Sequence, residues 1–463
     1  MNEIREDMVN QTNLFKEIEQ SVLNQAKLEL KRYFEQKDLE IKNSNWRLKE
    51  GWIIHDNNIK RTQITEFGDV TFKHTKYKNK NTGKYAFLVD PFLQIQKYSR
   101  VVYDLKMKII NSFEGGERQK DIIRFFKNAN FNRQTVSNIL QSINSQDLAK
   151  HIENNNKVIE SDNDIVYIDI DDCWSTIRNK YKKEEIRIRV AVAYETRERN
   201  NKKYELKNKR AFVKTFSKGK KCDTHDYSKY LLQMLETNYG DLSKKQIILC
   251  GDGANWIKEI ADYIGAEYIL DKFHLFQKIY RCFAYKKSSK SKNSDRLKDL
   301  YQKTIEYYSE NKINELVQFL TTCLDMEKLN IQRIKEAIRY ITNNRKGIEN
   351  HFKSWNNGCH AEAAVSHLIK STKGYGAKIY SKNNFEILIN IKIAKINGIN
   401  LVNFLTNKLK DKLQETISDQ YFDNSNNDNK NTNKNRKLKE INLPILDKPS
   451  TIYSTRIRNL NNS

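Results

Sequence analysis

Two aspartates stand just after apolar segments, in a pattern that suits metal-dependent chemistry. Asp171 follows residues 165–170, and Asp252 follows residues 246–250 and one glycine. If both segments are strands of an open α/β sheet, their carboxyl ends lie at the edge where ligands bind, so the two carboxylates can converge. Carboxylate oxygens suit Mg²⁺, and two such ions about 3.5 to 4 Å apart can support an in-line phosphoryl displacement. The sequence therefore predicts a magnesium-dependent phosphoryl-transfer site.

Each aspartate also has a structural interpretation. Acids at strand ends commonly cap or form turns, and Gly251-Asp252-Gly253 is consistent with a tight turn, although the same glycines would let a phosphate approach closely. Asp169 and Asp172 are alternatives to Asp171 as the first acid. Since side chains alternate along a strand, Asp169 should share a face with Asp171, whereas Asp172 should point to the other face.

The charge of the chain points to a polyanionic partner. Its 463 residues include 83 Lys and Arg against 58 Asp and Glu, a net charge of +25, so nucleic acid is the leading partner class. The N-terminus is charged and leads into no apolar segment, and no stretch approaches the roughly 18 apolar residues of a membrane span. We therefore expect neither a secretory signal nor membrane insertion.

The six cysteines are scattered singly, without a C-x-x-C pair. This spacing argues against a zinc ribbon and against a disulfide framework, and a reducing cytoplasm is the simplest compartment for the chain. Cys359, His360 and His367 lie close to Glu362 in the sequence, but no second cysteine stands at ligand spacing. We interpret them as packing or DNA-contact residues rather than as a zinc site.

Residues 118–142 have the spacing of a helix-turn-helix. Two short helices are predicted around a turn at 129–131, with Asn132 capping the second helix and apolar residues pointing inward. A recognition helix carries its base-reading groups on its outer side, and here that side has Arg133, Gln134, Ser137 and Asn138. Any small helical hairpin could share this degenerate motif, but the net charge favours DNA contact.

The rest of the sequence predicts a multidomain α/β protein. Residues 13–41 have an apolar stripe at helical spacing, residues 70–89 indicate a basic β-hairpin, and residues 165–283 indicate a mixed sheet with helices. The expected parts are an N-terminal helical segment (1–50), a small basic β region (51–105), a helix-turn-helix region (106–150), a catalytic core in two parts (151–283 and 351–415) around an all-α insertion (284–350), and a flexible polar tail (416–463).

Four motifs in order give the chain a resemblance to a known family. They are Ile168-Asp-Ile-Asp-Asp, Gly251-Asp-Gly-Ala-Asn-Trp-Ile-Lys, Leu270-Asp-Lys-Phe-His-Leu and Gly358-Cys-His-Ala-Glu-Ala-Ala-Val-Ser-His. A similar N-terminal block begins at Glu66. Together they resemble the signature blocks of DDE transposases of the ISLre insertion-sequence group, from about residue 14 to residue 400.

The resemblance implies a ribonuclease H-like catalytic domain that a helical insertion interrupts. It implies that Asp171, Asp252 and Glu362 are the catalytic, metal-binding triad, holding two Mg²⁺ ions, with Mn²⁺ as an alternative. Asp271 and His274 would support the site or contact DNA, or they are only a helix cap and a surface histidine. Glu349 is a rival of Glu362 for the third position.

The chain departs from that family in two places. After the third acid, residues 368–380 replace an arginine-rich stretch and a Pro-Met-Gly-Trp sequence, so we expect Lys370 and Lys373 to contact DNA instead. In the first block, Asp171-Asp-Cys-Trp stands where relatives usually have Asp-Glu-Asp-His. The choice of Asp171 among its acidic neighbours therefore rests on an alignment by eye.

The sequence thus predicts an insertion-sequence transposase that binds the terminal inverted repeats of its own element. It would cleave and transfer DNA strands by metal-dependent phosphoryl transfer. Its expected partners are double-stranded DNA, both the element ends and the target, and further copies of the chain, since joining two ends in concert needs two active sites. The alternative is a helix-turn-helix DNA-binding regulator with a catalytically inactive core.

Overall fold

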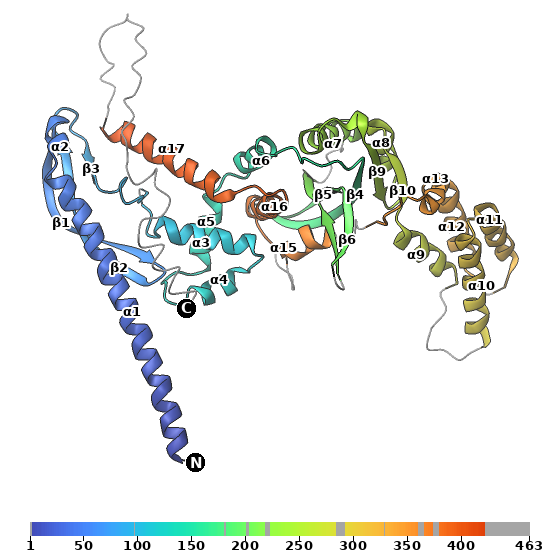
Figure 1. The fold of residues 1–463 in the computed structure, drawn as a ribbon, viewed down its shortest axis with the longest axis horizontal. Helices are drawn as coiled ribbons and strands as arrows, with labels where there is room; N and C mark the ends of the chain where they lie inside the picture. The colour runs from blue at the N-terminus through green and yellow to red at the C-terminus, as the bar shows by residue number, and fades with distance from the viewer. Residues whose placement is uncertain are drawn as a thin grey trace, which may run out of the picture. The chain divides into compact units, whose positions relative to one another are not determined.

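The computed structural model describes residues 2–96, 98–179, 182–200, 203–217, 223–283, 292–327, 329–359, 365–373 and 379–421. The chain divides into a first unit, residues 1–142 with 400–463, and a second unit, residues 143–399. Both helices and sheets are present (Figure 1), which confirms the predicted α/β class. Within the described residues, no helix combines the length and the apolar composition that a membrane crossing requires.

The first unit combines a small antiparallel sheet with helices. The sheet has the order β1 (Trp52–Thr65), β2 (Gly68–Asn79), β3 (Tyr85–Ala86). The predicted hairpin corresponds to β2 and β3, whereas β1 was not predicted, because polar residues around Asp56 break its alternation where its register against β2 shifts. The helices are α1 (Asn2–Lys42), α2 (Asn45–Lys49), α3 (Tyr103–Glu114), α4 (Gln119–Phe125), α5 (Arg133–Gln141) and α17 (Leu401–Tyr421).

The long helix α1 runs along the edge of β2 that β3 leaves uncovered (Figure 1). Glu35 accepts a hydrogen bond from the backbone nitrogen of Lys73 at 3.0 Å. Asp38 accepts from the backbone nitrogen and the hydroxyl of Thr75 at 3.0 and 2.7 Å. The helix therefore satisfies strand groups that would otherwise be open to pairing. Towards its N-terminus the predicted apolar stripe stays exposed at Leu14, Phe15, Ile18 and Val22.

A five-stranded mixed sheet of order β10-β9-β4-β5-β8 organises the second unit. β4 (Ile165–Asn179), β5 (Lys182–Tyr194) and β8 (Arg210–Ser217) are antiparallel, while β9 (Gln246–Gly251) and β10 (Glu267–Leu270) continue parallel to β4. All five were predicted from the sequence. The additional hairpin of β6 (Thr196–Asn200) and β7 (Lys203–Lys207) was not, because its residues are almost all polar.

Helices cover the sheet and extend its core. The second unit contains α6 (Ser145–Asn154), α7 (Thr224–Tyr239), α8 (Asn255–Ile264), α9 (Lys272–Phe283), α10 (Lys292–Ser309), α11 (Ile313–Thr322), α12 (Ile331–Asn343), α13 (Arg345–Glu349), α15 (Ser371–Lys373) and α16 (Lys382–Ile396), with short turns of helix at Leu242–Lys244, Cys323–Asp325, Asn350–Phe352 and Ser366–Lys370. Apolar residues of α7 and α8 pack on one face of the sheet, in the same cluster as buried residues of α11 and α12. The predicted helical segment therefore shares the core of the sheet.

Side chains complete both outer edges of this sheet. At β10, Asn350 donates to the carbonyl oxygen of Tyr268 at 2.9 Å, and His351 Nε2 bonds that of Leu270 at 2.6 Å. At β8, the amide of Asn397 accepts from the backbone nitrogen of Ala211 and donates to its carbonyl oxygen, at 2.8 and 3.3 Å. These bonds satisfy backbone groups at both edges that would otherwise be open to pairing.

Candidate functional site

The strand register brings Asp171 and Asp252 to equivalent positions. The parallel ladder between β4 and β9 ends with Asp169 opposite Cys250, and the two aspartates stand two residues further along each chain segment. Asp171 shares the face of Asp169, since side chains two residues apart lie on the same face of a strand, whereas Asp252 lies just past the end of β9. The expectation that the first strand ends before Asp171 is wrong, since β4 continues to Asn179 because β5 pairs with it to its end. Asp171 is nevertheless just past the point where β4 leaves its parallel neighbour.

Asp252 sits in the tight turn that its neighbouring glycines allow. One of its carboxylate oxygens, Oδ1, accepts from the backbone nitrogen of Ala254 at 3.0 Å. Gly253 has a φ of +92°, and a Cβ at Gly251 would lie 2.6 Å from a methyl of Ile257. The turn interpretation is thus confirmed, and it leaves the carboxylate half-buried at the edge of the sheet. Asp171 is half-buried as well, with its Oδ1 accepting from the backbone nitrogen of Asp172 at 2.7 Å.

Asp172 has a structural partner on the opposite face, as the alternation predicted. Its carboxylate forms a two-point ion pair with Arg189 on β5, Nε to Oδ1 at 2.8 Å and Nη2 to Oδ2 at 2.9 Å. The Arg189 side chain is 1% exposed, and its guanidinium lies 3.5 Å from the ring centre of Trp256 on α8. This pair holds Asp172 on the face that α7 and α8 cover, so it cannot share the position of Asp171.

Asp169 lies beside two cysteines rather than at the edge. Cys250 and Cys359 are joined as a disulfide across 109 residues of sequence, and an Asp169 carboxylate oxygen and both sulfur atoms lie within 4.8 Å of one another. The expectation of unpaired cysteines is therefore wrong for these two, because the fold and not the sequence spacing brings them together. Asp169 is buried at 1% exposure, which leaves Asp171 as the accessible acid of that face.

Asp271 behaves mainly as a helix cap. Its Oδ1 accepts from the backbone nitrogen of Phe273 at 2.9 Å, at the start of α9, and His274 Nε2 lies 3.8 Å from its Oδ2. Burial, with the charges of Asp252 and Asp271 adding to it, raises the pKa of the Tyr340 hydroxyl. Since the charges of both acids raise the pKa of the same tyrosine, Asp271 lies close to Asp252.

The third acid is outside the described residues. This applies to Glu362 and to its neighbour His360. Cys359, three positions before Glu362, is the residue bonded to Cys250. The rival Glu349 is half-exposed on α13, where its carboxylate pairs with Arg345 at 2.7 Å.

The candidate recognition helix has the predicted cap and outer face. The Asn132 side chain accepts from the backbone nitrogen of Thr135, while Val136, Ile139 and Leu140 are buried. Outside, Gln134 donates to Asn138 at 2.7 Å, Arg133 is exposed and Ser137 is half-buried. A cavity of about 570 Å³ adjoins this helix and is lined by Asn138, Arg100 and Lys106. The helix-turn-helix motif does not predict the last two residues, because they lie outside it in the sequence.

The expected substitutes for the family's arginines lie on two short helical turns. Lys370 is exposed at the end of Ser366–Lys370, whereas the side chain of Lys373 is outside the described part of the chain, as is that of His367. Lys392 of α16, which is not among the predicted site residues, donates to the Ser371 hydroxyl at 2.6 Å. Burial lowers the pKa of Lys392 to about 8. The sequence carries no motif that would have marked this lysine.

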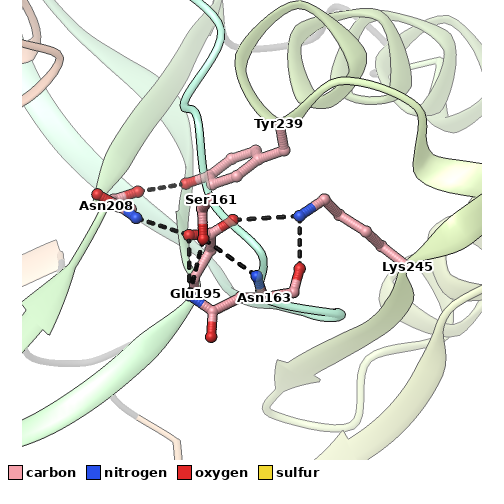
Figure 2. Close-up of polar contacts among 6 residues, drawn as sticks. All are labelled: Ser161, Asn163, Glu195, Asn208, Tyr239 and Lys245. Atoms are coloured by element: carbon pink, nitrogen blue, oxygen red, sulfur yellow. Dashed lines mark hydrogen bonds and ion pairs between the residues drawn. The ribbon is translucent and has the colours of Figure 1, made fainter.

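A second polar cluster lies at the opposite end of the parallel strands. Figure 2 shows Glu195 receiving hydrogen bonds from Asn208 at 2.6 Å, and from Asn163 and Lys245 at 3.3 Å each. Burial raises the pKa of Glu195, but these bonds and one from Ser161 outweigh it and hold that pKa below its ordinary value. The cluster connects the residue after β5 to the segments that precede β4 and β9. We therefore interpret it as structural.

Comparison with known proteins matches most of the chain. The family model described as "Uncharacterised protein family (UPF0236)" covers residues 4–408. Three UPF0236 proteins of Caldanaerobacter subterraneus subsp. tengcongensis are each 26% identical over 355 to 363 residues, which is 76% of this chain and 67 to 71% of the relatives. Their names join four, two and eleven locus designations of that organism.

Proposed function

We propose that this chain, which belongs to the uncharacterised protein family UPF0236, is a DDE transposase of the kind that the ISLre insertion-sequence group contains. It binds the terminal inverted repeats of its own element, and it cleaves and transfers DNA strands by Mg²⁺-dependent phosphoryl transfer. The observation that carries the proposal is the β4–β9 register, which ends at Asp169 opposite Cys250; two residues further on, each chain segment has an aspartate, Asp171 on β4 and Asp252 in the turn after β9.

The order of the sheet supports a ribonuclease H-like core. Three antiparallel strands, β8, β5 and β4, continue into two parallel strands, β9 and β10, and helices lie between the parallel strands in sequence. The carboxyl ends of parallel strands are where an open α/β sheet binds its ligands. Asp171 and Asp252 belong to that edge, whereas the Glu195 cluster belongs to the other end.

The donors at this edge suit a hard cation. Both carboxylates are half-buried rather than enclosed, and Asp252 uses Oδ1 in the turn, so Oδ2 lies outside that hydrogen bond. Magnesium prefers a few carboxylate oxygens and keeps several waters and phosphate oxygens in its octahedron. Bound there, Mg²⁺ would activate the attacking oxygen and stabilise the leaving one. Asp171 and Asp252 would hold the metal, and lysines such as Lys370 would hold the DNA backbone.

Glu362 completes the proposed triad. It follows Cys359 by three residues, and three peptide units span at most about 11 Å. The Cα atoms of Cys359 and Cys250 are 5.8 Å apart, and Cys250 precedes Asp252 by two residues. Glu349, by contrast, uses its carboxylate in the ion pair with Arg345, which favours Glu362.

DNA recognition is assigned to the helix-turn-helix of α4 and α5. The net charge of +25 supplies the sequence-independent attraction, and Arg133 on the exposed side of α5 has the length and donors to read a guanine. The exposed apolar residues of α1 offer a surface for a second copy, as concerted joining of two ends requires. Relatives named by up to eleven loci of one organism fit an element that copies itself within a genome.

Asp252→Asn tests the proposal. The substitution removes a charge that binds metal but no phosphate contact, so it should abolish cleavage of element-end DNA while the gel-shift affinity stays within about twofold. Asp262→Asn, an exposed acid on α8, is the matched control and should cleave normally. If the wild-type chain binds the ends but never cleaves with Mg²⁺ or Mn²⁺, the regulator alternative replaces the enzyme.

A further inference from the structure

Cys250 and Cys359 form a disulfide next to the candidate metal site. Cys250 lies on β9, 3% exposed, in an apolar cluster with Tyr167, Tyr194, Ile248 and Ile269. Cys359 is half-buried at the end of a segment, residues 353–359, that has neither helix nor strand. The pair thus fastens an irregular segment to the central sheet.

The position of the pair connects it to the acids. Cys250 stands two residues before Asp252, and it is paired in register with Asp169, which stands two residues before Asp171. The segment has other contacts: the Tyr167 hydroxyl donates to the carbonyl oxygen of Trp355 at 2.7 Å, and Arg197 Nη1 donates to that of Asn357 at 3.3 Å. Trp355 also packs against the apolar cluster around Cys250, and Asn356 donates to the carbonyl oxygen of His351 at 2.7 Å. The covalent bond is the firmest tie of the segment to β9.

We propose that Cys250 and Cys359 are a redox-responsive site that tightens the metal-binding edge when it is oxidised. Regulation of this edge rests on the proposed function, whereas the formation of the bond does not. The oxidant is a peroxide. It converts the half-exposed thiol of Cys359 to a sulfenic acid, with one oxygen atom transferred and one water released. The thiol of Cys250 then attacks that sulfur, the S–S bond forms and a second water leaves. Two thiols and one peroxide give one disulfide and two waters.

The reduced form frees the end of the segment. Without the bond, residues 353–359 keep the hydrogen bonds of Trp355 and Asn357, while Cys359 can move away from β9. Cys250, two residues before Asp252, then no longer holds Cys359 in place. The metal-binding edge of the sheet therefore samples more conformations. Because a metal site gains affinity when its ligands are held in place, the reduced protein should bind a divalent ion more weakly.

The other described cysteines provide an internal contrast. Cys282 and Cys323 are buried in the helical core, and burial raises the pKa of the Cys282 thiol to about 12. A thiol that stays protonated is a poor nucleophile towards peroxide. Cys173 is half-buried on β4 and does not belong to the Cys250–Cys359 pair, so Cys173→Ser is the matched control for loss of one accessible thiol.

Peptide mapping of the full chain tests the bond. The reduced protein is treated with hydrogen peroxide, its remaining thiols are alkylated under denaturing conditions, and peptides are identified by mass spectrometry. We expect a linked Cys250–Cys359 peptide, while Cys282 and Cys323 are recovered alkylated. Recovery of Cys250 and Cys359 as unlinked alkylated peptides, or zinc retained on the reduced protein in a ratio of one per chain, would overturn the proposal.

Mn²⁺ titration calorimetry tests the coupling to the edge. The oxidised wild-type chain should bind Mn²⁺ at least about threefold more tightly than the reduced chain, and Cys173→Ser should keep that difference. Cys359→Ser should bind as the reduced form does under both conditions. Equal affinity of both wild-type forms overturns the coupling. Absence of Mn²⁺ binding in both forms instead overturns the proposed metal site, while the linked peptide still establishes the redox pair.

Discussion

Tyr340 donates its hydroxyl to the backbone carbonyl oxygen of Asp252 across 2.6 Å. Tyr340 belongs to α12, in the predicted helical insertion, and Asp252 belongs to the turn after β9, 88 residues earlier in the sequence. At the end of α12, Asn344 lies 3.0 Å from the position of a Cβ on Gly253. The helical segment therefore packs directly against the turn that carries the candidate metal ligand.

Replacing Tyr340 by phenylalanine should loosen that turn. The change removes one partly buried hydrogen bond, which is worth about 1 kcal/mol, and leaves the ring in place. We expect Mn²⁺ affinity and cleavage rate to fall several-fold, with the affinity for DNA unchanged. Calorimetry and a cleavage assay measure the two quantities. Tyr263→Phe, at an exposed tyrosine of α8, is the control. An equal loss of Mn²⁺ affinity in both variants would show that the Tyr340 hydrogen bond does not support the site.

The neighbouring acids Asp171 and Asp172 should respond in opposite ways to loss of charge. Asp172→Asn leaves the buried guanidinium of Arg189 without its counter-ion, which costs about 3 to 5 kcal/mol of the free energy of unfolding. Asp171→Asn should cost less than about 1 kcal/mol but abolish cleavage. Urea unfolding followed by circular dichroism measures the first quantity. A stable Asp172→Asn variant that no longer cleaves would assign the catalytic role to Asp172 instead.

Arg133→Ala tests base reading by α5. If the side chain contacts a base, binding to element ends should weaken by about 1 to 3 kcal/mol, while binding to unrelated DNA changes little. Fluorescence anisotropy at moderate salt, with unrelated competitor DNA, separates the two. Lys120→Ala, an exposed lysine of α4, should weaken binding to any sequence equally. If Arg133→Ala leaves the affinity for both DNAs unchanged, α4 and α5 serve only in packing and do not contact DNA through this side chain.

His351 should make the second unit less stable in acid. Its Nε2 faces the carbonyl oxygen of Leu270, and its Nδ1 lies 2.9 Å from the hydroxyl of Tyr308, so the neutral ring donates through Nε2 and accepts through Nδ1. Burial, followed by the charge of Lys272, lowers its pKa from 6.5 to about 4. Between pH 6.5 and about 4, the His351 ring is protonated in the unfolded chain but stays neutral in the folded chain. The contribution of His351 to the free energy of unfolding is therefore complete above pH 6.5 and is lost as the pH falls to about 4.

The expected loss is up to about 3 kcal/mol across that range. His351→Gln keeps a donor for Leu270 but cannot titrate, so its free energy of unfolding should vary less between pH 6.5 and 4 than that of the wild type. His225→Gln, at an exposed histidine of α7, should leave the pH dependence unchanged. Urea unfolding at several pH values makes the comparison, and parallel curves for wild type and His351→Gln would contradict the assignment.

Local patterns in the sequence determined much of the second unit. All five strands of its sheet, the helices between them and the helical segment were predicted, because apolar periodicity records which residues face a core. The Asn132 cap of α5 was also predicted, since a cap depends on residues three positions apart. The two carboxylates after apolar segments were likewise visible before any fold was known.

Tertiary structure decided what each acid and cysteine does. Asp169, Asp171 and Asp172 are nearly equivalent in the sequence, but Arg189 of β5 holds Asp172 on one face and the disulfided Cys250 lies beside Asp169 on the other. The bond between Cys250 and Cys359 and the contact of Tyr340 with Asp252 depend on partners 109 and 88 residues away. The extension of β4 to Asn179 depends on pairing with β5 along its whole length. Short-range periodicity carries no information on such distant pairs, because they form only when the chain closes around one core.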